Sequence, residues 1–238
     1  MFRLKYKIVR TLSHGEHATV CVVRSRFSGR EYLAKKTKPP QAALDELDHL
    51  HLLKGKPGMP ELHDFYVNRS RTWFIFRWYR GGELYDRIHR EEYDSIVRCR
   101  VLLLALSRAV HEAHACNIAH LNVCPENFVF GRDHQVHLVD FVHARRIYNP
   151  WLNSLIGPVG ETPFAAPETQ ATHMPYFTCT SDVYSLGVLY SLLALGRSTP
   201  DDQDLQRDMT YENPTQRADL ATVIQRLVAL LPPPPPSQ

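Results

Sequence analysis

The feature that most constrains the fold of this chain is a change of sequence pattern at Gly81-Gly82. Before this pair, short runs of β-branched and aromatic residues alternate with turn residues, which is typical of strands. After it, apolar residues recur with the spacing of helices. With 238 residues, 44% of them hydrophobic, the chain is long enough to bury a core in each part. We therefore predict an α+β fold with a β-rich lobe in residues 1–80, a helical lobe in 81–231 and a proline-rich tail in 232–238.

The expected elements can be placed along the chain from the same patterns. The first part should contain strands at 6–9, 19–23, 30–36, 62–67 and 73–78, with a helix at 42–53. The second part should contain helices at 84–90, 96–116 and 183–195, with a hairpin-like pair of strands at 128–130 and 136–139.

Several short motifs lie along this pattern in a fixed order. They are Tyr32-Leu33-Ala34-Lys35, Asp45-Glu46-Leu47, the loop His120-Leu121-Asn122-Val123-Cys124-Pro125-Glu126-Asn127, Asp140-Phe141-Val142, Ala166-Pro167-Glu168, S-D-V-Y-S-L-G at 181–187 and N-P-T-Q-R at 213–217. Each motif alone is weak. Together, and in this order, they resemble those of the protein kinase family across residues 6–227.

The resemblance is closer to one branch of that family. The stretch G-G-E-L-Y-D-R-I at 81–88 is similar to the G-G-E-L-F-D-R-I of the titin and myosin light chain kinase group. Residues 139–145, together with 148–150 and 195–198, are most similar to obscurin and the striated-muscle preferentially expressed kinase. This likeness implies a domain of a large sarcomeric protein in the cytoplasm of muscle.

The resemblance also implies a nucleotide site between the lobes. Lys35 would hold the α and β phosphates and pair with Glu46, and Asn127 and Asp140 would bind Mg²⁺ if ATP and Mg²⁺ bind. The residues implied to contact the nucleotide are Leu12, Gly15, Val20, Leu33, Lys35, Glu46, Arg77, Tyr79, Glu83 and Val129. ATP and Mg²⁺ stay open as cofactors at this point.

Two catalytic positions of the family's loop have changed residue type. In kinases an Asp accepts the substrate hydroxyl proton and a Lys lies beside the transferred phosphoryl group. Here these positions hold Asn122 and Cys124. An amide has no basic lone pair near neutral pH, and a thiol carries no permanent positive charge. The frame of the loop is therefore present without its catalytic residues.

The nucleotide site departs from the family's pattern as well. Of the glycines in the phosphate-covering loop only Gly15 remains, which restricts how closely the backbone can approach phosphates. Leu33 stands where a small alanine is usual, so we expect a narrowed adenine slot. Val142 replaces the glycine that lets the Asp140 segment change conformation.

The architectural positions, by contrast, are filled. The resemblance implies a buried ion pair between Glu168 and Arg217. It also implies an apolar column of Leu50, Leu62, Phe141 and His120. Far fewer residues than usual lie between Leu195 and Asn213, so we expect the lower part of the helical lobe to be shortened.

These observations favour a pseudokinase, which is a kinase-shaped interaction or scaffold domain with negligible phosphate transfer. Two alternatives stay open. The retained Lys35, Glu46, Asn127 and Asp140 would also suit an active but atypical serine/threonine kinase. The same residues would suit a domain that binds ATP and Mg²⁺ and changes conformation without catalysis.

Composition excludes several other classes. A net charge of +3 is too small to indicate nucleic-acid binding, and the apolar segments 101–110 and 183–195 are too short to cross a bilayer. The five irregularly spaced cysteines and the lack of a signal-peptide pattern favour reduced thiols and a cytoplasmic protein. Protein partners are expected. Pro232 to Pro236 could bind an SH3, WW or EVH1 module or serve as a linker.

Overall fold

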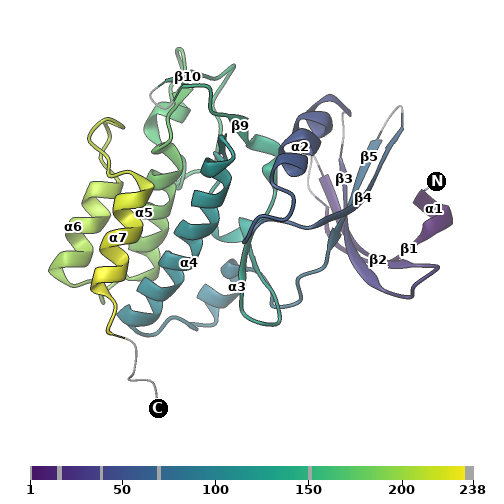
Figure 1. Cartoon of the computed structure of the whole chain (residues 1–238), viewed down its shortest axis with the longest axis horizontal. Helices are drawn as coiled ribbons and strands as arrows, with labels where there is room; N and C mark the ends of the chain where they lie inside the picture. The colour runs from purple at the N-terminus through teal and green to yellow at the C-terminus, as the bar shows by residue number, and fades with distance from the viewer. Residues whose placement is uncertain (1, 15–17, 38–39, 69–70, 150–151, 234–238) are drawn as a thin grey trace.

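The computed structural model describes residues 2–14, 18–37, 40–68, 71–149 and 152–233 of the chain. These residues form a sheet-containing lobe and a helical lobe joined near Gly81-Gly82 (Figure 1). The two-lobe α+β fold expected from the sequence is confirmed. Gly15 and the proline run from Pro234 onward lie outside the described residues, so the predictions made for them are not examined by the structure.

The first lobe is built on one antiparallel sheet of five strands in the order β1-β2-β3-β5-β4. The strands are β1 (Tyr6–His14), β2 (Ala18–Ser25), β3 (Glu31–Thr37), β4 (Leu62–Asn68) and β5 (Arg71–Arg77). Helix α2 (Pro40–Leu52) follows β3 and lies against the sheet on the side of the second lobe (Figure 1). It supplies Leu47 and Leu50 to the core that the lobes share, and Leu53, just after the helix, adds to the same core.

A one-turn helix, α1 (Phe2–Lys5), precedes the first strand. The sequence patterns predicted the strand that begins at Tyr6 but not this helical turn before it. The Phe2 ring stacks on Trp73 with ring centroids 4.1 Å apart and also contacts Tyr6. Burial of this aromatic side chain fixes the turn, although four residues alone are too few to form a stable helix.

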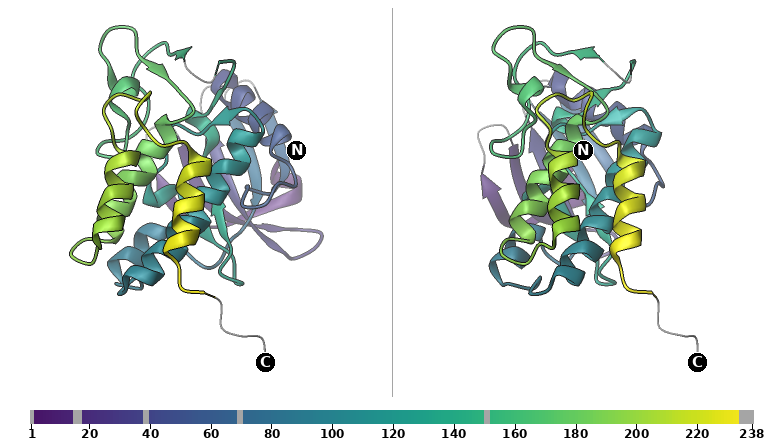
Figure 2. Two further views of the ribbon diagram at one scale, coloured as in Figure 1. Left: turned by 60° about the vertical axis from the view of Figure 1, so that its left-hand side comes forward. Right: turned by 90° about the vertical axis from the view of Figure 1, so that its left-hand side faces the viewer.

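The second lobe contains the longer helices. They are α3 (Leu84–His89), α4 (Ile96–Ala115), α5 (Ser181–Leu193), α6 (Pro200–Met209) and α7 (Leu220–Leu230). Helix α4 packs between α5 and α7, and α6 packs on α5 (Figure 2). Along α4 the buried residues recur at helical spacing, so that its apolar face forms the centre of the core.

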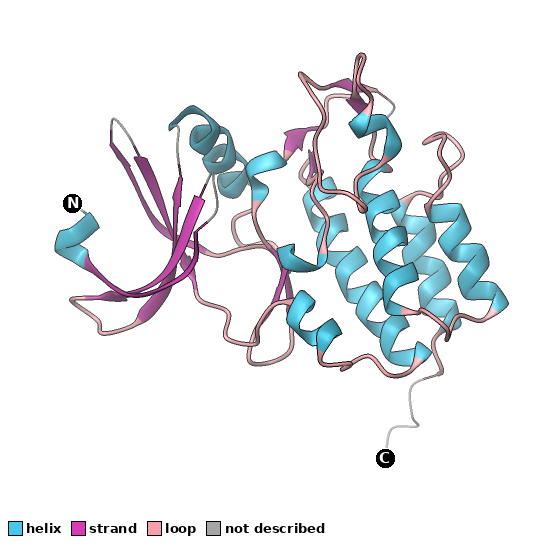
Figure 3. Ribbon diagram, turned by 180° about the vertical axis from the view of Figure 1, so that it is seen from behind, coloured by secondary structure: helices cyan, strands magenta, loops and turns pink. Residues whose placement is uncertain are grey.

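Short strands and single turns lie beside these helices, partly toward the first lobe and partly at one end of the helices (Figure 3). The strand pairs are β7 (Phe128–Phe130) with β8 (Val136–Leu138), β6 (Ile118–Ala119) with β9 (Arg145–Arg146), and β10 (Asn153–Ser154) with β11 (Tyr176–Phe177). The 3₁₀ turns are η1 (Pro125–Asn127), η2 (Phe141–His143) and η3 (Pro167–Gln170). These segments carry most of the motif residues identified in the second part of the chain.

Between Leu195 and Asn213 the structure places one helix, α6. Its N-terminus is closed by a capping box between Thr199 and Asp202. Asp202 is fully buried and accepts hydrogen bonds from Arg100 at 2.8 Å and from the Tyr190 hydroxyl at 2.5 Å. This network attaches α6 to α4 and α5 in the shortened region.

The apolar column expected from the resemblance is also present. Leu50, Phe141 and His120 are buried, and Leu62 packs against the same core. The His120 and Phe141 rings meet edge to face with centroids 4.8 Å apart. The column therefore connects α2 with the loop at residues 120–127, which we call the catalytic-type loop, across the boundary of the two lobes.

Candidate active site

A cavity of about 670 Å³ lies between the two lobes. Strands β1, β2, β3 and β5 and helix α2 line it from the first lobe, and α3, η1, β7 and residues 139–140 line it from the second. Its volume is in the range of small-molecule sites. Leu33 lines the cavity without closing it, so the narrowing expected at this position leaves room for a ligand.

Lys35 forms a buried charge cluster at this cavity. Its Nζ donates to Glu46 Oε1 and Oε2 at 2.8 and 3.0 Å, and to Asp140 Oδ1 at 2.6 Å. Burial opposes the charged form of Lys35, but the carboxylates of Asp140 and Glu46 outweigh it and raise the pKa of the amine. The lysine is therefore a fixed positive charge. The expected contact between Lys35 and Glu46 is present, and a role in holding phosphates stays a prediction.

The residues implied as metal ligands offer oxygen atoms in the same cavity. Burial would raise the pKa of Asp140, yet Lys35 holds it below its ordinary value, so the carboxylate is ionised. The side-chain amide of Asn127 donates through Nδ2 to the Asn122 carbonyl at 2.8 Å. Within the described chain, neither Asp140 Oδ2 nor Asn127 Oδ1 makes a hydrogen bond. A carboxylate and an amide oxygen of this kind fit the ligand preference of Mg²⁺.

The backbone of the catalytic-type loop is held by Asp182 at the start of α5. Its carboxylate accepts the amides of His120 and Leu121, each at 2.8 Å, and the His114 Nε2 lies 2.9 Å away. Burial lowers the pKa of His120, so its ring is neutral. Its Nε2 then donates to the Val139 carbonyl at 3.0 Å. The loop is therefore as firmly positioned as its motif predicts.

Asn122, at the position of the family's catalytic Asp, is buried rather than open to the cavity. Only 6% of its surface is exposed, and it is not among the residues that line the cavity. Its Oδ1 accepts no hydrogen bond from the described part of the chain. A buried amide of this kind has neither the basicity nor the access that proton removal from a substrate requires.

Cys124, at the position of the family's lysine, is a buried neutral thiol. Its Sγ and a carboxylate oxygen from each of Glu126 and Glu161 all lie within 4.8 Å of one another. Burial, followed by the charges of Glu126 and Glu161, raises the pKa of the Cys124 thiol far above its ordinary value. The three residues could contact a cation, but a thiol beside two exposed carboxylates is no metal site by itself. Two carboxylates therefore lie close to the position at which the family has a positively charged lysine.

The structure brings together most of the residues predicted for the site. Those that line the cavity are Leu12, Val20, Leu33, Lys35, Glu46, Arg77, Tyr79, Glu83, Asn127, Val129 and Asp140. Asn122 and Cys124 lie buried in the loop next to it, and Gly15 falls outside the described residues. Whether these residues bind a nucleotide stays a prediction.

Sequence reasoning missed several charged residues of the site. Arg10, Asp86 and Glu126 also line the cavity. Glu126 stands inside the loop motif and could have been found there. Glu161 had no usable signal, because the stretch before Ala166-Pro167-Glu168 matches the family only in scrambled form.

The predicted ion pair between Glu168 and Arg217 is confirmed. Arg217 Nη1 and Nη2 each lie 2.7 Å from one oxygen of the Glu168 carboxylate, and both side chains are buried. The pair joins η3 to the segment before α7. Its two-pronged geometry is the strong form of an arginine–carboxylate contact.

Comparison with protein families matches residues 6–228 to the protein kinase domain. Among curated proteins, the chain is 28% identical over 225 residues to death-associated protein kinase dapk-1 of Caenorhabditis elegans, which covers 89% of the chain and 15% of that protein. It is 26% identical over 227 residues to maternal embryonic leucine zipper kinase of Danio rerio, covering 88% and 32%. It is 31% identical over 159 residues to myosin light chain kinase 3 of Rattus norvegicus, covering 65% and 19%.

The chain thus spans less than half the length of these relatives. In the described residues, none of the helices combines the length and apolar character that a membrane crossing requires.

Proposed function

Because this chain belongs to the protein kinase family, we propose that it is a pseudokinase, a kinase-shaped domain that binds other proteins and transfers negligible phosphate. The observation that carries the proposal is the state of the catalytic-type loop. Its backbone is held in place by Asp182, whereas Asn122 is a buried amide and Cys124 is a neutral thiol.

The loss of a positioned base alone typically lowers a rate by about 10²- to 10⁴-fold. Phosphate transfer depends mostly on positioning and electrostatics, so the missing lysine charge should lower the rate further. Glu126 and Glu161 add negative charge at the same place, which would oppose the approach of phosphate oxygens. The retained contacts of Glu168 with Arg217, and of Asp182 with the loop backbone, support the fold rather than the reaction.

The experiment that tests this proposal is intact-mass spectrometry of the purified chain after incubation with ATP and Mg²⁺. The expected result is no added phosphate beyond that of Asp140→Asn, which removes a predicted metal ligand. Phosphate that appears on the wild type and not on the variant would instead support the alternative of an active atypical serine/threonine kinase, which the names of the relatives also favour.

A second candidate function is a conformational response to ATP without transfer. It is favoured by the intact cluster of Lys35, Glu46 and Asp140, by the available oxygen of Asn127, and by the open cavity. When bound, Mg²⁺ would neutralise part of the phosphate charge at Asp140 and Asn127. Lys35 would then be shared between the carboxylates and the phosphates.

Thermal denaturation with ATP, with and without Mg²⁺, tests the second candidate. A ligand at 100 times its dissociation constant stabilises the native state by about 2.7 kcal/mol, which raises the melting temperature measurably. A magnesium-dependent rise that Asp140→Asn abolishes would support it. An unchanged melting temperature at millimolar ATP would leave the interaction domain as the remaining function.

We also propose a cytoplasmic location in or near the cytoskeleton. The support is the likeness of residues 81–88 to the titin and myosin light chain kinase group, and the 31% identity to myosin light chain kinase 3. Fluorescence microscopy of the tagged full-length protein in muscle cells tests the location. Diffuse signal without sarcomeric striation would contradict it.

A further inference from the structure

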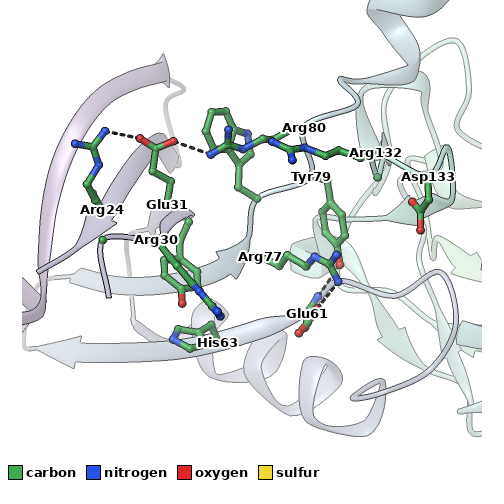
Figure 4. A pocket seen from close by; sticks show the side chains of 14 residues that line it. Arg24, Arg30, Glu31, Glu61, His63, Arg77, Tyr79, Arg80, Arg132 and Asp133 are labelled. Atoms are coloured by element: carbon green, nitrogen blue, oxygen red, sulfur yellow. Dashed lines mark hydrogen bonds and ion pairs between the residues drawn. The ribbon is translucent and has the colours of Figure 1, made fainter. Parts of the chain in front are cut away.

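A second and larger cavity adjoins the active-site cavity and shares with it the lining segment 77–80. It has a volume of about 1170 Å³ and is lined by both lobes (Figure 4). The ends of β2 to β5 contribute from the first lobe, and the turn between β7 and β8 contributes Gly131, Arg132 and Asp133 from the second. We call this cavity the arginine groove. Its lining residues are Arg24, Gly29, Arg30, Glu31, Tyr32, Glu61, His63, Arg77, Trp78, Tyr79, Arg80, Gly131, Arg132 and Asp133.

The side-chain composition of the groove is that of a protein-binding surface. Five arginines, two tyrosines and one tryptophan are among its lining residues, and no lysine is. Arginine, tyrosine and tryptophan are the residue types that dominate the binding energy of protein interfaces, whereas lysine is depleted there. Aromatic rings are also held in place, since Tyr79 stacks on His137 at 3.9 Å and Tyr32 on His63 at 4.4 Å.

Part of the charge in the groove is already paired. Glu31 accepts from Arg24 at 2.7 Å and from Arg80 at 2.8 Å, and Glu61 accepts from Arg77 at 3.1 Å (Figure 4). The Arg80 guanidinium also lies over the Trp78 ring, 4.4 Å from its centroid. These contacts preorganise the arginines, which lowers the conformational entropy that binding would cost.

Two arginines of the groove have no carboxylate partner among the described residues. Arg30 is on the turn before β3 and Arg132 is on the turn after β7, so they come from different lobes. Both are exposed, and no ion pair involves either of them in the described chain. They therefore offer two unpaired positive charges to a ligand that contacts both lobes.

We propose that the arginine groove binds an extended acidic segment of a protein partner, with carboxylates of that segment paired to Arg30 and Arg132. This inference names the binding surface of the interaction domain proposed above and rests on that proposal.

A single-stranded nucleic acid is another ligand that favours arginine and aromatic residues. The groove also contains the carboxylates of Glu31, Glu61 and Asp133, however, and these would repel a continuous phosphate backbone. A peptide with spaced charges avoids this repulsion.

The test is fluorescence anisotropy of the whole chain with a labelled peptide in which glutamate alternates with leucine. The matched control peptide carries lysine in place of glutamate. We expect binding of the acidic peptide alone, and weaker binding as salt rises, because exposed charges are screened. The variant with Arg30→Glu and Arg132→Glu together should bind about tenfold more weakly or worse, because like charges then meet.

Arg108→Glu is the matched control variant, since Arg108 is an exposed arginine on α4 outside the groove. It should change the affinity by less than about twofold. The inference would be overturned if Arg108→Glu lowered the affinity for the acidic peptide equally, or if that peptide did not bind. A preference of the chain for a single-stranded oligonucleotide would overturn it as well. A phosphate-transfer assay on the same samples tests the proposed pseudokinase function independently of peptide binding to the groove.

Discussion

At the scale of single residues, Asn122 shows most clearly how the site differs from a working kinase loop. Its side chain is buried, and Oδ1 has no hydrogen-bond donor within the described residues. We predict that Asn122→Asp destabilises the fold by about 1–3 kcal/mol, because a carboxylate would be buried there without a donor. Urea denaturation measures the loss. Asn122→Ala is the control and should cost less, since it removes an amide oxygen that is already unpaired.

The buried pair of Glu168 and Arg217 gives a second prediction at this scale. Arg217→Met leaves the Glu168 carboxylate buried without its partner, which should cost about 3–5 kcal/mol of stability. Asp94→Ala is the matched control, because it breaks an exposed pair with Arg98 that is worth about 0.3–0.5 kcal/mol. Similar losses in the two variants by urea denaturation would contradict the structural role given to Glu168 and Arg217.

Some of these residues could be identified from the sequence and others could not. Lys35, Glu46, Glu168 and Arg217 stand in short motifs whose residue types and order are specific, so their pairing could be predicted. The burial of Asn122 could not, because the motif gives the residue type and not the direction of its side chain. Glu161 was missed because the sequence around it departs from the family's order.

At the scale of elements, helix α6 is anchored by the buried carboxylate of Asp202 together with the buried side chains of Leu205 and Met209. Burial would raise the pKa of Asp202, but hydrogen bonds from Arg100, Tyr190 and Thr199 hold it far below its ordinary value. We predict that Asp202→Ala costs about 3–5 kcal/mol, because the partly buried Arg100 loses its carboxylate partner and the N-terminus of α6 loses its capping box. Hydrogen exchange should become faster in α6 first.

Asp204→Ala is the control for this prediction. Asp204 is also on α6, but its pair with Arg207 is exposed on both sides. Hydrogen exchange in α6 should be nearly unchanged in this variant. Faster exchange in Asp204→Ala than in Asp202→Ala would show that the network around Asp202 does not anchor the helix.

The elements were predictable to different degrees. The strands and long helices follow from clear periodicity, and the structure extends β1 to His14 and ends β5 at Arg77, one residue before the predicted end. The helices at 200–209 and 220–230 were not predicted, although Thr199, Pro200 and Asp202 form a recognisable N-terminal signal for the first of them. The turn at Phe2 could not be found, since a tertiary contact with Trp73 forms it.

At the scale of the whole molecule, buried and partly buried histidines make stability depend on pH. Burial lowers the pKa of His49, His120, His137 and His143 below the value of 6.5 expected in the unfolded chain. Below pH 6.5 the unfolded chain therefore binds more protons than the folded one, and stability falls as pH falls. We predict a lower melting temperature at pH 5.5 than at pH 7.5. An equal or higher one at pH 5.5 would contradict the burial of these rings.

The whole molecule retains the architecture of the kinase fold, whereas its catalytic-type loop has different residues at the two catalytic positions. The lobes share one apolar column, and a fixed cluster of Lys35, Glu46 and Asp140 connects them at the cavity. Changing Asn122 to aspartate and Cys124 to lysine should therefore keep the fold but should not restore phosphate transfer. Asn122 lies below the cavity surface, and the position of Cys124 is also buried.

The central claim is that this kinase fold does not transfer phosphate. The most direct measurement is the rate of transfer from ATP to a serine-containing peptide by the wild type, by Lys35→Ala, and by the double variant with Asn122→Asp and Cys124→Lys. We predict that the wild type and Lys35→Ala give the same background rate, and that the double variant gains little. Robust magnesium-dependent transfer by the wild type, abolished in Lys35→Ala, would contradict it.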